Sequence, residues 1–319
     1  MPSRFPFRFG VINERVLPTK DWIDNVRKIE SLGFDTFLIR DHFVPDFFGD
    51  QLAPITAMST AAAVTSTLRV GTLVLDNDYR HPVLLAKEAA TIDLLSGGRL
   101  ELGLGAGWLR REYEIAGIEY HSAGTRIARL EEAIQILKAA FSGEPVTFNG
   151  EHYQIHGYEN VPRTCQQPGP PILLGGGKPR MLRLAGREAD IISLLTTSVA
   201  SGVVERDPAE RLAASVDQKL AWIREGAGER FPEIELNLIP SLLITDDRHA
   251  EARRLIESNS WDNITVDDVF KMPSVFIGTH DQIIETMQER RERFGFSYYV
   301  FSDRELEASA PVVEALAGR

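Results

Sequence analysis

The feature that most constrains the fold of this chain is an alternation of short apolar runs with amphipathic helical patterns from one end to the other. Such alternation is typical of parallel strands joined by crossover helices. The clearest helical pattern covers 127–141, where apolar residues recur at spacings of three and four before Gly143. The apolar runs predict eight strands, at 7–12, 36–39, 70–75, 100–104, 172–174, 190–195, 234–244 and 298–301.

One segment, 143–170, breaks this alternation. Apolar residues alternate on both sides of Asn149-Gly150, and prolines follow. This pattern predicts a β-hairpin and a Pro-rich loop inserted between the fourth helix and the fifth strand. We find no linker-like stretch, so we expect 1–319 to form a single domain with an insertion at about 143–170.

Eight βα units fit a closed barrel and also a long, open, doubly wound sheet. A dinucleotide-binding turn of the open sheet needs Gly-x-Gly-x-x-Gly after the first strand. The best candidate, 103–108, follows the fourth strand and has Trp108 in place of the third glycine. The sequence therefore favours an α/β fold of the (β/α)8 TIM-barrel type.

Composition excludes several functions and compartments. Asp and Glu number 46 against 35 Lys and Arg, a net charge of −11 that disfavours nucleic-acid and anionic-membrane partners. The single cysteine, Cys165, excludes internal disulfides. The longest apolar runs fall far short of the roughly 20 residues of a membrane span, and the N-terminus lacks an unbroken apolar run. We expect a cytoplasmic protein that binds a small molecule and no metal.

Polar residues follow each predicted strand, and the carboxyl ends of barrel strands carry the active site in proteins of this architecture. These residues are Asn13-Glu14, Arg40-Asp41-His42, Asp76-Asn77-Asp78, Gly105 to Trp108, Gly175 to Lys178, Thr196 to Ser198, Thr245-Asp246 and Ser302-Asp303.

Two of these segments suggest chemistry. Gly175-Gly176-Gly177-Lys178 precedes Pro179, which suits the first position of a helix, so backbone N–H groups there can bind an anion. A turn that only needs flexible backbone is the alternative. Histidine side chains can donate or accept protons near neutral pH, so His42, beside Asp41, is a candidate acid-base residue, and a purely structural role is the alternative.

Residues 81–108, the run Gly175-Gly176-Gly177 and 185–190 resemble the luciferase-like monooxygenase superfamily. The resemblance covers nearly the whole chain. It implies a TIM barrel that binds FMN or the deazaflavin coenzyme F420, usually as a homodimer. The motif Asp41-His42-Phe43 is similar to that of the deazaflavin-dependent branch, which favours F420 over FMN.

The resemblance also implies roles for individual residues. His42 would transfer the proton that accompanies hydride transfer, and Leu73-Val74 would form a cis peptide behind the cofactor ring. Trp108 stands where the sugar-phosphate dehydrogenases of this branch have an acid-base Glu, so we place it with His42 as a candidate catalytic residue and expect a substrate other than glucose 6-phosphate. The implied cofactor contacts are Asp41, Leu73, Val74, Asp76, Ala106, Gly107, Gly175, Gly176, Gly177, Lys178, Arg180 and Met181.

The sequence thus predicts an oxidoreductase that exchanges a hydride between F420 and a small organic substrate. The first alternative is an FMN-dependent monooxygenase on the same barrel, and the second is a non-catalytic flavin- or deazaflavin-binding protein. A cofactor-free lyase or isomerase is a further alternative, with Lys178 as its only evident catalytic group.

Overall fold

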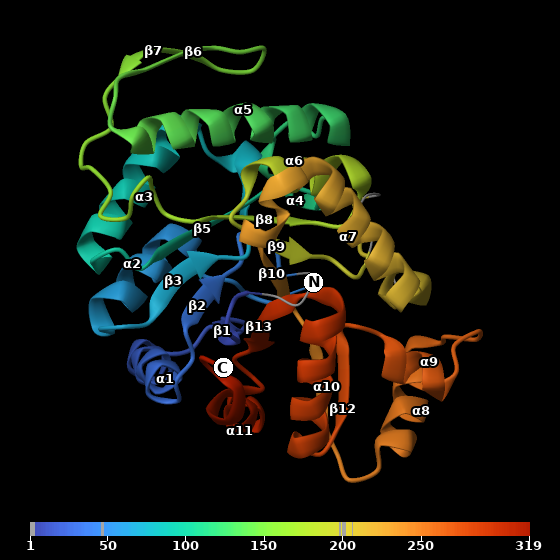
Figure 1. Ribbon diagram of the computed structural model, residues 1–319. Coiled ribbons are helices and arrows are strands. Elements are labelled where there is room, and N and C mark those ends of the chain that lie inside the picture. The colour runs from blue at the N-terminus through green and yellow to red at the C-terminus, as the bar shows by residue number, and fades with distance from the viewer. Residues whose placement is uncertain (1–3, 46–47, 198, 200–201, 206) are drawn as a thin grey trace.

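Eight strand positions form a closed parallel barrel in the computed structural model, which describes residues 4–45, 48–197, 199, 202–205 and 207–319. The strand order is β3-β2-β1-β13-β10-β9-β8-β5-β4, and pairing of β3 with β5 closes the barrel (Figure 1). The predicted TIM barrel is confirmed. The strands are β1 (Arg8–Ile12), β2 (Thr36–Ile39), β3 (Arg69–Thr72) with its continuation β4 (Leu75–Asp76), β5 (Leu100–Gly105), β8 (Ile172–Gly176), β9 (Ile191–Leu194), β10 (Glu235–Leu238) and β13 (Phe296–Ser302).

Helices surround the barrel and bury one face each against it. Gly97 and Gly143 end α3 and α5 in the left-handed conformation, as expected of glycine after the last helical turn. No helix within the described ranges is long and apolar enough to cross a membrane. The helices are α1 (Thr19–Ser31), α2 (Pro54–Val64), α3 (Pro82–Ser96), α4 (Arg110–Ala116), α5 (Ala123–Ser142), α6 (Pro179–Glu188), α7 (Ala213–Ala227), α10 (His280–Phe294) and α11 (Leu306–Leu316), with 3-10 turns η1 (Asn77–Tyr79), η2 (Pro208–Arg211) and η3 (Gly228–Glu233).

The predicted hairpin is present as antiparallel β6 (Val146–Asn149) and β7 (Gln154–Tyr158). It lies beyond α5, away from the barrel strands (Figure 1). The carboxylate of Glu132 on α5 accepts hydrogen bonds from backbone N–H groups of the hairpin turn, at 2.7 to 3.0 Å. The hairpin turn is therefore attached to α5, and the loop that follows it contacts α3, where Asn160 donates to the Ala86 carbonyl and the Gln166 N–H donates to Asp93.

The predicted strand at 234–244 is wrong in its extent. The barrel strand β10 ends at Leu238, and the chain then leaves the barrel to form β11 (Ser241–Ile244). β11 pairs in parallel with β12 (Val275–Gly278), a strand that we did not predict. Between them lie α8 (Arg248–Asn259) and α9 (Val266–Lys271). Pro240 separates the two strands and has no N–H for a sheet hydrogen bond.

We call residues 241–278 the outer lobe. It has an apolar cluster of its own, which includes Trp261, Val269 and Met272. In Figure 1 the lobe lies to the side of the barrel, in orange. Thr245-Asp246, which we expected at the carboxyl end of the seventh barrel strand, instead follows β11 in this lobe. The residues at that barrel end are Ile239 and Pro240.

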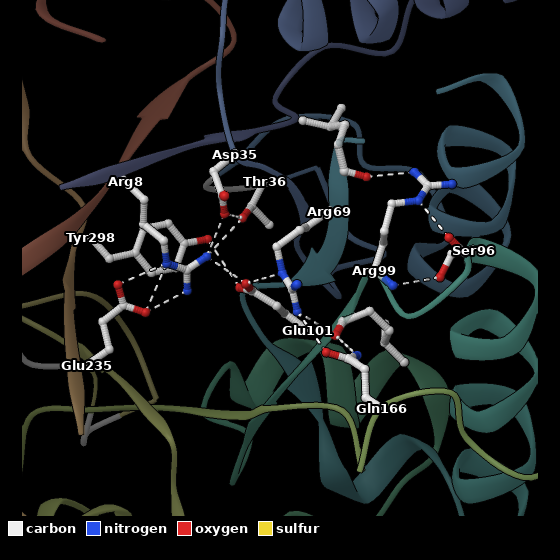
Figure 2. A network of polar contacts seen from close by, with 12 residues as sticks. Arg8, Asp35, Thr36, Arg69, Ser96, Arg99, Glu101, Gln166, Glu235 and Tyr298 are labelled. Atoms are coloured by element: carbon white, nitrogen blue, oxygen red, sulfur yellow. Dashed lines mark hydrogen bonds and ion pairs between the residues drawn. The ribbon is translucent and has the colours of Figure 1, made fainter. Parts of the chain in front are cut away.

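The amino end of the barrel is filled by a network of ion pairs (Figure 2). Arg8 on β1 contacts the carboxylates of Asp35, Glu101 and Glu235 at 2.6 to 2.7 Å. Arg69 on β3 contacts the same Glu101 at 2.8 Å. Burial alone would lower the pKa of Arg8, but the surrounding acidic side chains raise it overall. This end of the barrel is closed by charge pairing, and the opposite end remains open to a ligand.

Candidate functional site

A cavity of about 620 Å³ lies at the carboxyl ends of the barrel strands. Its volume is within the range of small-molecule and cofactor sites. All of the predicted site residues except Arg180 line it. They are Asp41, His42, Leu73, Val74, Asp76, Ala106, Gly107, Trp108, Gly175, Gly176, Gly177, Lys178 and Met181.

Arg180 is exposed and does not line this cavity. It is the second residue of α6, and its guanidinium lies near Gly124 at the start of α5. Its neighbour Met181 is buried and contributes to the cavity wall. Successive helical residues are about 100° apart around the axis, so two adjacent residues do not both face the same cavity.

His42 is held by a carboxylate that the sequence did not suggest. Its Nδ1 lies 2.9 Å from Oε2 of Glu112, the third residue of α4. The backbone N–H groups of Phe43 and Val44 donate to Oε1 of Glu112 at 2.7 and 3.3 Å, and the Tyr79 hydroxyl donates to Oε2 at 3.1 Å. Glu112 therefore fixes both the imidazole and the backbone that follows it.

The protonation of this pair follows from its surroundings. Burial alone would raise the pKa of Glu112, but the hydrogen bond from His42 and those from the backbone N–H groups lower it overall. An ionised carboxylate only accepts hydrogen bonds, so Nδ1 of His42 carries the hydrogen. In the neutral ring, Nε2 then has the free lone pair. His42 lines the cavity, and within the described parts of the chain Nε2 has no hydrogen-bond partner.

Two aromatic side chains contact the His42 ring. Phe48 stacks on it with ring centroids 4.8 Å apart, and Trp108 meets it edge to face at 5.7 Å. The Arg40 guanidinium in turn lies over the Phe48 ring, 4.4 Å from its centroid. The candidate acid-base residue thus has apolar walls that limit the access of water to the ring.

Asp41 is buried and fully paired on the floor of the site. The Arg80 side chain donates to both of its carboxylate oxygens, and the Asp76 N–H donates to Oδ2 at 3.0 Å. The Leu73-Val74 peptide between β3 and β4 is cis, as the resemblance implied. These contacts connect the end of β2 to the end of β4 beneath the cavity.

Asp76, the last residue of β4, is buried, with 8% of its surface exposed. It accepts hydrogen bonds from the Tyr113 hydroxyl and the Asp78 N–H. Burial raises its pKa to about 7, and the neighbouring charges of Asp78 and Asp41 act in the same direction. The site therefore contains a carboxyl group that changes its charge near neutral pH.

This raised pKa predicts a loss of stability of the ligand-free protein as pH rises. Below its ordinary pKa of 3.8, Asp76 is neutral in both the folded and the unfolded chain. Between about 4 and 7 the unfolded carboxyl ionises first, so the free energy of unfolding falls, by on the order of 2 to 4 kcal/mol. Urea unfolding at pH 5 and pH 8 should reveal this fall in wild type and a smaller one in Asp76→Asn. Exposed Asp262→Asn is the control, and an equal fall in all three proteins would contradict the prediction.

The Gly175–Lys178 segment forms the end of β8 and the start of α6, as predicted. Lys178 is the N-cap residue, makes no side-chain cap, and pairs with Glu210 at 2.6 Å. The first hydrogen bond of the helix runs from the Leu182 N–H to the Lys178 carbonyl. The N–H groups of the first turn are therefore available to an anion within the helix dipole.

We predict that Gly177→Asp weakens cofactor binding by about 2 kcal/mol or more, because a negative side chain enters the space where backbone N–H groups meet an anion. A Cβ at this position would lie 3.1 Å from the Leu195 carbonyl oxygen and 3.2 Å from the Leu195 Cβ, so Leu195 must shift slightly in either variant. Gly177→Ala is therefore the matched control, since it adds the Cβ without the charge. A cofactor Kd that is equal in the two variants would show that charge has no role, and normal circular dichroism must accompany both.

Three charged side chains described in the cavity wall escaped the sequence analysis: Glu112, Arg126 and Arg211. Glu112 is 70 positions from His42. The helix that carries it is rich in charged residues and looks like a solvated surface helix. A buried charge within such a helix gives no local signal. Among the described residues, no group of three His, Cys, Asp or Glu side chains is arranged to hold a metal ion.

The fold and this cavity define a class of barrel proteins whose chemistry takes place at the carboxyl ends of the strands. Residues 6–263 match the model of the luciferase-like monooxygenase family, and the chain belongs to that family. It is an oxidoreductase of this family.

Two relatives and one structure illustrate its similarities. The chain is 28% identical to an F420-dependent glucose-6-phosphate dehydrogenase of Amycolatopsis mediterranei (strain U-32), over 79% of each chain. It is 32% identical to an FMNH(2)-dependent dimethylsulfone monooxygenase of Pseudomonas fluorescens (strain Pf0-1), over 77% of this chain and 65% of that protein. The fold matches coenzyme F420-dependent tetrahydromethanopterin reductase from Methanopyrus kandleri with a TM-score of 0.74 and 18% identity, over 98% of this chain and 99% of that one.

Proposed function

We propose that this protein exchanges a hydride between coenzyme F420 and a small organic substrate, with His42 transferring the accompanying proton. The observation that carries the proposal is the His42–Glu112 pair. Glu112 binds Nδ1 of His42, which leaves Nε2 of this cavity-lining side chain free to exchange a proton. The motif Asp41-His42-Phe43 supports the deazaflavin over the flavin, and an F420-dependent relative supports it independently.

The cavity fits a flat cofactor with an anionic tail. Glycines at 105, 107, 175, 176 and 177 line it without side chains, and the Leu73-Val74 peptide lies between them and β2. The uncapped first turn of α6 would bind the phosphate. When bound, the deazaflavin supplies the carbon that accepts or donates the hydride, and the remaining chemistry belongs to the protein.

The protein contributes a proton acceptor or donor and a cavity that excludes water. Nε2 of His42 would accept a proton from a substrate hydroxyl in the oxidative direction, or return it in the reverse direction. Glu112 stabilises the imidazolium that forms, because its carboxylate already accepts the Nδ1–H hydrogen bond. Phe48 and Trp108 hold the ring in one orientation.

Side-by-side fluorescence titrations of the protein with F420 and FMN test the cofactor. We expect F420 to bind with a lower Kd than FMN. Binding of FMN with no response to F420 would overturn the assignment and support the FMN-dependent monooxygenase, which the dimethylsulfone monooxygenase relative favours. Tight binding without turnover of any substrate would support a carrier protein instead.

Glucose 6-phosphate is not the substrate that we propose. The resemblance to the deazaflavin-dependent branch implies that Trp108 stands where its sugar-phosphate dehydrogenases have an acid-base Glu. The structure has Trp108 against the His42 ring, with its carbonyl oxygen accepting a 2.9 Å hydrogen bond from the Tyr120 hydroxyl. An indole at this position offers an apolar surface and an N–H donor, but no group that exchanges a proton near neutral pH.

The homodimer implied by the resemblance stays a prediction. The surface of α3 is compatible with a dimer, because three of its leucines are exposed to solvent in the single chain: Leu84, Leu94 and Leu95. Sedimentation at micromolar concentration should give about twice the chain mass of 35.6 kDa. A single species with the mass of one chain would contradict the prediction.

A further inference from the structure

Among the described residues, four cationic side chains line the cavity, and three of them already have polar partners. Arg40 forms an ion pair with Glu14 at 2.6 Å, and Lys178 forms one with Glu210 at the same distance. Arg126 donates to two backbone carbonyl oxygens. These three cations have fixed structural contacts, so the fourth differs from them.

The fourth is Arg211, the last residue of η2 in the connection from β9 to α7. Across the described ranges it makes no ion pair and no side-chain hydrogen bond. Its guanidinium carbon lies 5.8 Å from the ring centroid of Trp261. Burial lowers its pKa, without an acidic neighbour to compensate. A half-buried guanidinium with no anion is costly, and it gains most when a ligand supplies one.

The surroundings of Arg211 select the kind of anion. The nearby Lys219 ammonium is saturated, because it contacts the Glu210 carboxylate, the Glu210 carbonyl and the Leu195 carbonyl. Among the cations described on this side of the cavity, Arg211 therefore remains to bind a ligand. One planar guanidinium matches one carboxylate in a two-pronged contact.

The rest of this wall is mainly apolar. Trp261 comes from the outer lobe, Ile239 from the point where the chain leaves the barrel, and Val204 from the β9–α7 connection. A ligand whose carboxylate reaches Arg211 therefore places the flat or apolar group next to that carboxylate against these side chains. The carboxyl groups of the cavity lie on the β2, β4 and α4 side, which the strand order puts across the barrel from β9.

We propose that Arg211 binds a carboxylate of the substrate and that Trp261 contacts the apolar group next to it. This inference rests on the proposed function, in which the cofactor occupies the side of the cavity formed by β3, β5 and β8. A substrate acid would find a guanidinium without an anion at Arg211, whereas the opposite side of the cavity offers it the carboxyl groups of Asp41 and Asp76. The two ends of the cavity then set the direction in which an acidic substrate enters.

Benzoate is the smallest probe with this chemistry, and neutral benzamide is its matched analogue. We would titrate the cofactor-free protein with each and follow tryptophan emission, because Trp108 and Trp261 line the cavity. We expect saturable benzoate binding in wild type, and a Kd at least about tenfold higher in Arg211→Gln. Arg211→Lys, which keeps the charge but loses the planar fork, should give an intermediate Kd.

Arg224→Gln is the matched control, because Arg224 lies 4.7 Å over the Phe231 ring and outside the cavity. It should bind benzoate as wild type does. Benzamide should bind equally to wild type and to Arg211→Gln. The proposal is overturned if wild type shows no saturable benzoate binding, or if Arg211→Gln leaves the Kd unchanged.

A second arm distinguishes a substrate acid from an acid of the cofactor. We expect the F420 and FMN Kd values to be the same in wild type and Arg211→Gln, and benzoate to bind when the cofactor is present. Loss of cofactor affinity in the variant, with displacement of benzoate by the cofactor, would overturn the proposal. The first arm needs no cofactor, so a wrong cofactor assignment and a wrong Arg211 assignment give different results.

Discussion

Replacement of His42 by alanine is expected to slow hydride transfer by about two to four orders of magnitude, the usual contribution of a positioned acid or base. The cofactor Kd should change no more than severalfold, because His42 is not among the predicted cofactor contacts, several of which lie on backbone at Ala106-Gly107 and Gly175–Gly177. Single-turnover absorbance changes of the bound cofactor at saturating substrate measure the rate.

Two variants make this result specific. His156→Ala removes an exposed imidazole of the hairpin and should keep the wild-type rate. Glu112→Gln should reduce the rate less than His42→Ala does and shift its pH dependence, since the amide no longer stabilises the imidazolium. A rate in His42→Ala within threefold of wild type would leave His42 as a packing residue only.

Replacement of Glu101 by alanine is expected to destabilise the fold by about 3 kcal/mol, because Arg69 loses its carboxylate partner and Arg8, which keeps Asp35 and Glu235, loses one of three. Glu101 is 2% exposed and receives both Arg8 and Arg69 (Figure 2). Arg8 lies 3.7 Å from the Tyr298 ring centroid, so the ring prevents it from turning toward water. Urea unfolding of the cofactor-free protein measures the change.

The surface pair Lys28–Glu307 provides the comparison, since both side chains are exposed. Glu307→Ala should change the free energy of unfolding by no more than about 1 kcal/mol. Equal effects of the two substitutions would mean that the network at the amino end of the barrel does not stabilise the fold.

The barrel was predictable because its eight βα units repeat a pattern that depends on local periodicity. The error in the seventh unit also has a local cause. Residues 236–244 contain one apolar run, and apolar periodicity does not reveal that Pro240 divides it between two sheets. β12 has four residues, as β2 and β9 do, but it belongs to the outer lobe and lies outside the alternation of strands and helices that predicted those two.

The site was predictable where backbone or strand ends form it and unpredictable where distant charges meet. Gly175–Lys178 and Asp41-His42 follow strands, so their position in the barrel follows from topology. Glu112 and Arg211 are important because of what surrounds them in space: Glu112 accepts hydrogen bonds from four donors, and Arg211 has no anion among the described residues. Neither property is encoded by neighbours in sequence.

The separation of β11 from β10 has a consequence for how this protein can diversify. Trp261 and Asn259 reach the cavity from the outer lobe, whose apolar cluster is separate from that of the barrel. Substitutions in that cluster can reshape one wall of the binding site without repacking the strands that carry His42 and the glycine-rich loop. Directed evolution for new substrates should therefore accept many more changes in 241–278 than in the barrel, with the melting temperature of the barrel left nearly constant.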